Sequence, residues 1–211
     1  MPKNIFALSP GRAGSMTFVH ACEGIEGFTA GHESRVDRVG TARLAYPENH
    51  IEADNRLVWH LGQLAQKYDG QDVLYVHLRR DPEKIAQSYL KRWLEFEFSA
   101  GILPAFANGI VMREKPWPVE ERLDVARYYV ETVIANTEEF LKSRPHIDVH
   151  LEDGGVSFNN FLNRMSATGD LEAVRAAWAS VKNDHNHSRE IHATNRLSRR
   201  IARRLGWTTK G

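Results

Sequence analysis

Cysteine is nearly absent from the 211-residue chain, and so are long apolar runs. The one cysteine, Cys22, excludes an intramolecular disulfide. No stretch approaches the run of about 18 apolar residues that a membrane-spanning helix needs, so we expect no membrane span. The apolar stretch near the amino terminus is too short for a signal peptide, and we therefore expect a cytoplasmic protein.

Repeats, low-complexity tracts and an excess of one charge are also missing. The formal net charge is +1, which gives no reason to expect a nucleic-acid partner. Cys and His residues at the usual zinc spacing are missing too, so we expect no metal. What remains is the composition of an ordinary globular protein, which we interpret as a single domain over residues 1–211. The sequence does not indicate an oligomeric state.

Basic residues are concentrated in one place, because residues 189–211 carry seven Lys or Arg against one Glu. Leu197, Ile201 and Leu205 recur there every four residues, which is typical of a solvated helix with one buried stripe. A docking surface for an anionic nucleotide or an acidic acceptor is the alternative interpretation.

Predicted strands and helices alternate along the chain. Apolar runs predict strands over residues 4–9, 27–30, 72–78 and 146–151. Helical spacing and capping residues predict helices over residues 15–23, 52–68, 81–95, 120–143, 158–164, 171–182 and 193–205. This alternation predicts an α/β fold, in which a mostly parallel sheet lies between two layers of helices and the C-terminal part is helical.

Residues 93–117 follow neither period, since aromatic residues, glycines and prolines are mixed there. One interpretation is simple packing against the sheet. The other is an acceptor-binding lid, because long irregular segments in compact domains are often functional.

A glycine-flanked loop lies between the first strand and the first helix. Backbone N–H groups and the helix dipole would converge there on an anion such as a phosphate. The phosphate loop of nucleoside triphosphatases requires a lysine before its Ser or Thr, and that lysine is absent because Ser15 directly follows Gly14. Arg12 is the cation of this loop. The pattern predicts an anion site, although a plain structural turn is the alternative.

A second strand-to-helix junction carries another arginine. Arg80 precedes the helix that Asp81 caps, and Ser88 follows eight positions later, about two helical turns on. Both side chains can meet one phosphate at the strand edge. The plain alternatives are a surface ion pair for Arg80 and a neutral helix position for Ser88.

Together the two junctions resemble the nucleotide signature of the sulfotransferase superfamily, whose fold is a P-loop-like three-layer sandwich. The resemblance implies that the first loop binds the 5′-phosphosulfate of 3′-phosphoadenosine 5′-phosphosulfate (PAPS), and that Arg80 and Ser88 bind its 3′-phosphate. Met16 departs from the family pattern, which has Thr or Ser there. The implied donor-binding residues are Gly11, Arg12, Ala13, Gly14, Ser15, Met16, Thr17, Arg80 and Ser88.

A third stretch, residues 31–35, resembles the glutamate-bearing segment after the second strand of tyrosylprotein and carbohydrate sulfotransferases. The resemblance implies that Glu33 is the general base, with His32 as the alternative, and that Arg12 meets charge developing on the bridging oxygen. The resemblance to the family extends loosely to Glu152 and Asp153, after the last predicted strand. The family's C-terminal nucleotide loop has no clear match, although residues 182–187 lie about where it is expected.

The resemblance implies a sulfotransferase that passes a sulfuryl group from PAPS to a hydroxyl or amine of a small-molecule, carbohydrate or lipid acceptor, without a metal. A P-loop-type small-molecule or nucleotide kinase is an alternative, against which the missing lysine counts. A non-catalytic nucleotide-binding protein is another alternative.

Overall fold

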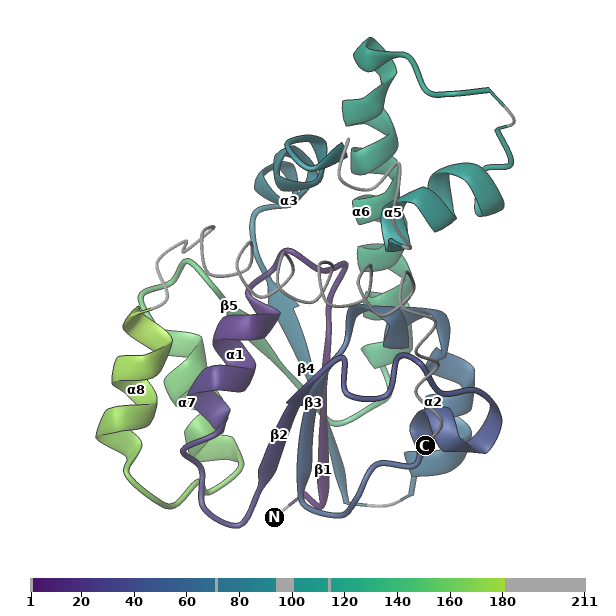
Figure 1. Cartoon of the computed structure of the whole chain (residues 1–211). Coiled ribbons are helices and arrows are strands. Elements are labelled where there is room, and N and C mark those ends of the chain that lie inside the picture. The colour runs from purple at the N-terminus through teal and green to yellow at the C-terminus, as the bar shows by residue number, and fades with distance from the viewer. Residues whose placement is uncertain (1, 71, 94–100, 114, 181–211) are drawn as a thin grey trace, which may run out of the picture. The chain divides into compact units, whose positions relative to one another are not determined.

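The structure is a computed structural model that describes residues 2–70, 72–93, 101–113 and 115–180 (Figure 1). The chain divides into two compact units, Met1–Ala179 and Ser180–Gly211. All described residues except Ser180 belong to the first unit. The single domain over the whole chain therefore stays a prediction. The expected helix over 193–205 and the suspected loop at 182–187 lie outside the described residues.

A five-stranded sheet forms the centre of the first unit, in the order β2-β3-β1-β4-β5. Its strands are β1 (Asn4–Leu8), β2 (Thr29–His32), β3 (His50–Ala53), β4 (Val73–Arg79) and β5 (His146–His150). Every neighbouring pair is parallel, which confirms the predicted parallel α/β sheet. β1 lies between β3 and β4, and all three strands run parallel. The loops that follow them are therefore neighbours at the carboxyl ends of the strands.

Helices cover both faces of the sheet (Figure 1). On one face lie α1 (Ser15–Cys22), α7 (Val156–Arg164) and α8 (Leu171–Ser180). On the other lie α2 (Leu61–Tyr68) and part of α6 (Arg122–Leu141). α3 (Pro82–Leu90) packs against α6. No helix of the described residues combines the length and apolar character needed to cross a membrane.

Aromatic side chains fill the core on each face. Phe6 of β1 contacts Tyr68 of α2 at a ring-centroid distance of 4.7 Å. On the opposite face, Phe18 of α1 contacts Phe161 of α7 at 5.2 Å. All five residues of β1 are buried, which explains the apolar run over residues 5–8. The sheet is thus the middle of three packed layers.

The helix expected over residues 52–68 is wrong at its start. β3 occupies the first positions, the 3-10 helix η2 (Asn55–Trp59) follows, and α2 begins only at Leu61. β3 has no apolar run because two of its buried residues, His50 and Glu52, are polar and bond each other at 2.9 Å (Nε2 to Oε2). Asp54 ends β3 by accepting a hydrogen bond from the Arg56 backbone N–H at 2.8 Å, and this cap starts η2.

The other elements agree with their predicted ranges within a few residues. β2 begins two residues later than expected, which makes Gly31 and His32 strand residues and Glu33 the first residue beyond the strand. α3 ends at Leu90, and the remainder of its predicted range up to residue 95 lies partly outside the described residues.

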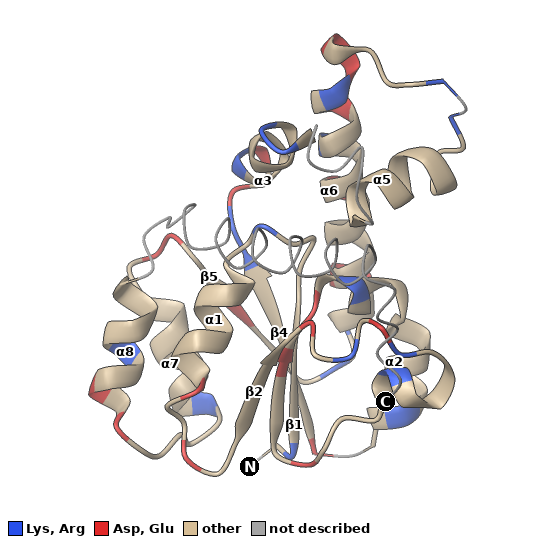
Figure 2. Cartoon of the chain, viewed as in Figure 1, with Lys and Arg blue, Asp and Glu red and all other residues tan. Residues whose placement is uncertain are grey.

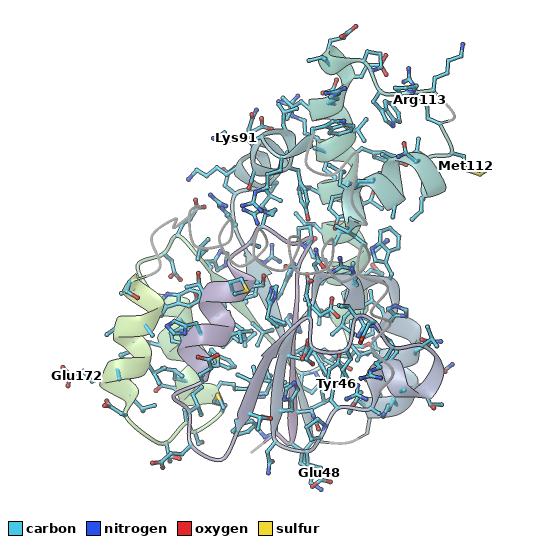
Figure 3. All side chains as sticks on the ribbon, in the orientation of Figure 1. Tyr46, Glu48, Lys91, Met112, Arg113 and Glu172 are labelled. Carbon is cyan, nitrogen blue, oxygen red and sulfur yellow. The ribbon has the colours of Figure 1, made fainter. Side chains whose placement is uncertain are left out.

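The irregular segment over residues 93–117 is described only in part. It contains the short helix α5 (Ile102–Pro104) and the π-helical stretch η3 (Ala105–Ile110), and the 3-10 helix η4 (Val119–Glu121) leads into α6. Met112 and Arg113 follow η3 and point away from the sheet (Figure 3). Whether this segment is a lid stays a prediction.

Candidate functional site

The loop after β1 has the backbone of an anion cradle. Gly11, Arg12 and Gly14 all have positive φ, at 84°, 60° and 92°. Gly14 is the N-cap residue of α1, so the free N–H groups of the first helical turn lie at the loop. A Cβ atom on Gly11 would lie 2.6 Å from both Asn55 Nδ2 and Tyr89 Oη, so this position requires glycine.

Two tyrosines from α3 and α6 bond the loop after β1. The carbonyl oxygen of Pro10 accepts hydrogen bonds from Tyr89 Oη of α3 at 2.6 Å and from Tyr129 Oη of α6 at 2.8 Å. Both side chains are buried, and burial raises the pKa of Tyr89 to about 12. The Tyr89 hydroxyl therefore keeps its proton at neutral pH and donates it to the loop.

The two predicted junctions meet in the structure. Arg12 Nε donates to Ser88 Oγ at 3.0 Å, and Arg80 Nη1 donates to the Arg12 carbonyl at 3.0 Å. Arg80 Nε is buried and lacks a hydrogen-bond partner among the described residues, since Glu152 Oε1 lies 3.9 Å away. Figure 2 shows basic residues where β4 passes into α3. The basic side chains of both strand ends thus lie in one cluster.

Glu152, which follows β5, anchors the start of α3. Its carboxylate accepts hydrogen bonds from the Asp81 backbone N–H at 3.2 Å and from Lys84 Nζ at 2.6 Å. The bond from Lys84 lowers the pKa of Glu152. This acidic group fixes the helix that carries Ser88 and lies close to Arg80.

The candidate base loop lies beside α1. His32 Nε2 and Ser15 Oγ are 3.0 Å apart, which connects β2 directly with the loop after β1. Burial lowers the pKa of His32 below its usual value, so the imidazole is neutral at pH 7 and can accept the serine proton. Glu33 has φ 52° and its Oε2 lies 2.9 Å from Arg56 Nη1. The structure therefore brings His32 to the loop and turns Glu33 towards Arg56.

A buried carboxylate that the sequence analysis missed supports this loop. Glu52 Oε1 accepts from the Ser34 backbone N–H at 2.8 Å, and Oε2 accepts from Ser34 Oγ at 2.6 Å. His50 bonds Glu52 through Nε2 and Thr29 Oγ1 through Nδ1, the latter at 2.7 Å. A Cβ atom on Gly31 would lie 2.8 Å from Glu52 Oε2. The available signal was a His and a Glu alternating with apolar residues in a short run.

The side chains of the other predicted donor-binding residues are either buried in the core or exposed at the surface. Ala13 and Thr17 are buried, at 1% and 5% exposure, so their side chains belong to the core, whereas Met16 is 56% exposed. The described part of the chain holds no group of three His, Cys, Asp or Glu side chains that is able to bind a metal ion.

No family model matches the sequence, and no curated protein matches it. Among solved structures, a sulfotransferase domain from the curacin biosynthetic pathway matches with a TM-score of 0.55 at 11% identity, covering 82% of this chain and 77% of that chain. The mouse sulfotransferase SULT7A1 complexed with PAP matches with a TM-score of 0.48 at 11% identity, covering 90% of this chain and 63% of the mouse chain. The present chain thus spans less than two thirds of the mouse protein.

The parallel sheet, its two helical layers and the loop at the N-terminus of α1 define an α/β fold of the P-loop-like class. Within that class, the fold is the sulfotransferase fold, as the likeness to the curacin domain shows. This confirms the fold that the motifs implied.

Proposed function

We propose that this protein transfers a sulfuryl group from PAPS to a hydroxyl or amine of an acceptor. The observation that carries the proposal is the convergence of two strand-to-helix junctions, in which Arg80 donates to the Arg12 carbonyl and Arg12 to Ser88, each at 3.0 Å. A donor with a phosphate at each end needs cations at both junctions. The acceptor class, whether small molecule, carbohydrate or lipid, and the cytoplasmic location are parts of this proposal.

The residues present fit such a donor. The amides at the start of α1 and the Arg12 guanidinium would hold the 5′ end. Ser88 and Arg80 Nε, which makes no hydrogen bond among the described residues, would hold the 3′-phosphate. Contact with the 3′-phosphate distinguishes this donor from ATP, which has no 3′-phosphate. The sulfotransferase fold supports the same assignment.

Residues of this chain carry the transfer step. PAPS supplies the sulfuryl group. Glu33 takes the proton of the acceptor's hydroxyl or amine while the acceptor's oxygen or nitrogen forms a bond to sulfur. At the same time the bond from sulfur to the bridging oxygen breaks, and adenosine 3′,5′-bisphosphate leaves. Arg12 and the loop amides neutralise charge on that bridging oxygen, and removing one such donor costs about 3 to 4 kcal/mol. His32 is the alternative base.

The donor assignment is tested by calorimetry with adenosine 3′,5′-bisphosphate and adenosine 5′-monophosphate. Arg80→Ala should weaken binding of the bisphosphate roughly 10- to 150-fold, because one charge-assisted hydrogen bond is lost. Binding of the monophosphate should change far less, since it lacks the 3′-phosphate. Because Arg80 also bonds the Arg12 carbonyl, Ser88→Ala is a second variant that removes a 3′ contact without altering Arg80.

Lys91→Ala is the matched control, since Lys91 is exposed and directly follows the same helix (Figure 3). Equal losses for both nucleotides in the Arg80 variant would contradict the 3′-phosphate assignment. Stronger thermal stabilisation by ATP with magnesium than by the bisphosphate would favour the kinase alternative instead.

A further inference from the structure

A hollow of about 370 Å³ is bounded by the segments that follow β2 and β3, and one of its lining residues, Arg56, pairs with Glu33. Its volume lies near the lower end of the roughly 300 to 1,000 Å³ usual for ligand pockets, which suits one small group rather than an extended chain. Four basic side chains line it and no Asp or Glu does. The polar lining consists of Arg38, Arg43, Arg56, His60 and Gln63.

One of these arginines is held in a buried ion pair. Arg43 is buried, pairs with Asp54 through Nη2 and donates to Tyr46 Oη through Nη1 at 3.0 Å. Tyr46 lies on the α2 side of the sheet (Figure 3). Asp54 is also engaged by the Arg56 backbone N–H. This pair forms a rigid wall of the hollow and leaves ligand binding to the other side chains.

Arg56 and Arg38 retain donors for a ligand. Arg56 uses Nη1 for Glu33 at 2.9 Å and for Asn55 Oδ1 at 3.4 Å, and its Nε and Nη2 have no hydrogen-bond partner among the described residues. A guanidinium carries five N–H donors, so one face of Arg56 remains available. The Arg38 side chain is 61% exposed, and within the described part of the chain its one ion pair is with Asp37, at 3.5 Å.

We propose that this hollow binds an anionic group of the acceptor, a carboxylate or a sulfate, through Arg56 and Arg38. The proposal rests on the proposed function, because it takes Glu33 as the base beside the hollow. The guanidinium of Arg56 contacts Glu33 on one side and the acceptor's anion on the other. The acceptor therefore carries its negative charge close to the hydroxyl or amine that is sulfated.

Position in the sheet separates this subsite from the donor site. The donor loop follows β1 and its partner motif follows β4, whereas the hollow is built from residues after β2 and β3. These two strands lie together at one edge of the sheet. An anion in the hollow therefore belongs to the second substrate and not to the nucleotide.

Inorganic sulfate is the first probe, and the side-chain NMR signal of His60 in the full-length, isotope-labelled protein is the readout. A His60→Gln variant assigns this signal among the ten histidines of the chain. At constant ionic strength, sulfate should shift the His60 signal along a saturable curve. Replacing Arg38 and Arg56 together by Gln should weaken this binding at least about tenfold, as expected when charge-assisted bonds are lost.

Two variants serve as controls. Arg12→Ala removes the donor-loop cation and should leave the sulfate response of His60 intact, and so should Arg164→Gln, which removes an exposed charge from α7. A His60 response that never saturates, or that persists unchanged in the Arg38 and Arg56 double variant, overturns the anion subsite. A normal sulfate response in a protein that binds no adenosine 3′,5′-bisphosphate removes the proposed function and leaves the anion subsite standing.

A matched pair of phenols tests the acceptor assignment with the same readout. 4-Hydroxybenzoate carries a carboxylate, and 4-hydroxybenzamide is its neutral counterpart of nearly the same shape. The acid should shift the His60 signal saturably and the amide should not. If sulfate binds while the acid behaves like the amide, the hollow accepts inorganic ions only and the acceptor assignment is overturned.

Discussion

Glu33 and His32 are neighbours whose side chains have different partners. His32 bonds Ser15 at the loop after β1, whereas Glu33 bonds Arg56, which follows β3. We expect Glu33→Gln to lower turnover roughly 100- to 10,000-fold, because the amide keeps the shape and loses the basicity. His32→Asn should cost much less. The measurement is kcat with an acceptor found by screening, with calorimetric binding of adenosine 3′,5′-bisphosphate as the control.

The reverse ranking would assign the proton transfer to His32. Burial lowers the pKa of that imidazole, so the acidic fall of a rate that depends on it would come at lower pH than for an ordinary histidine, whose reference pKa is about 6.5. Near-full turnover in both variants would remove both residues from the chemistry.

Gly11 offers a second test at the scale of one residue, and Gly27 is its matched control. Both have positive φ, at 84° and 78°, but only at Gly11 would an added Cβ atom meet neighbours at 2.6 Å. Ala at either position carries the backbone cost of about 1 to 2 kcal/mol. We expect Gly11→Ala to lower the free energy of unfolding by about 1 to 3 kcal/mol more than Gly27→Ala, from overpacking against Asn55 and Tyr89. Urea denaturation measures both, and equal losses would show that the loop tolerates a side chain.

At the scale of an element, β3 supports the candidate base loop through Glu52. Glutamine in its place keeps the size but has one oxygen acceptor instead of two, so one of the bonds from Ser34 or His50 is lost. We expect Glu52→Gln to lower the free energy of unfolding by about 1.5 to 3 kcal/mol, the usual contribution of a hydrogen bond to a charged group. Glu48→Gln is the control, since the exposed Glu48 makes only a surface ion pair with Lys3. Urea denaturation of both variants compares the two losses, and a Glu52 loss no larger than the Glu48 loss would contradict the supporting role.

The same element shows what the sequence could not predict. β1 and β4 have apolar runs that reveal them, and the junctions at Arg12 and Arg80 follow from strands that are easily found. β3 has buried His50 and Glu52 at alternate positions, and only its pairing with β1 and β2 makes a strand of it. Because the sequence predicts a helix over residues 52–68, it does not predict that Arg56 contacts Glu33 or that Glu52 contacts Ser34.

At the scale of the whole molecule, His77 makes stability depend on pH. Burial and the nearby Arg79 lower its pKa to about 4, while Asp148, Glu138 and His146 also lie near the ring and act on it electrostatically. The unfolded chain takes up this proton near pH 6.5 and the native protein only near pH 4, so stability is full above about 6.5 and falls as the pH drops towards 4.

We expect this histidine to account for up to about 3 kcal/mol of the loss in unfolding free energy between these pH values. His77→Gln should flatten the profile over that range in urea denaturation, whereas replacing the exposed His20 of α1, which pairs with Glu23, by Gln should leave it nearly unchanged. An unaltered slope in the His77 variant would assign the acid loss to other groups.

The central place of β1 in the sheet also bears on synthesis of the chain. Its two neighbours begin only at His50 and Val73, and β5 only at His146. At about 5 to 20 residues per second, the ribosome makes β1 roughly 4 to 15 s before β4 is complete. During that time β1, which is apolar over residues 5–8, lacks its β4 neighbour and has at least one edge unpaired. One edge of residues 4–8 therefore stays open to wrong pairing, or to a chaperone, until β4 has been translated.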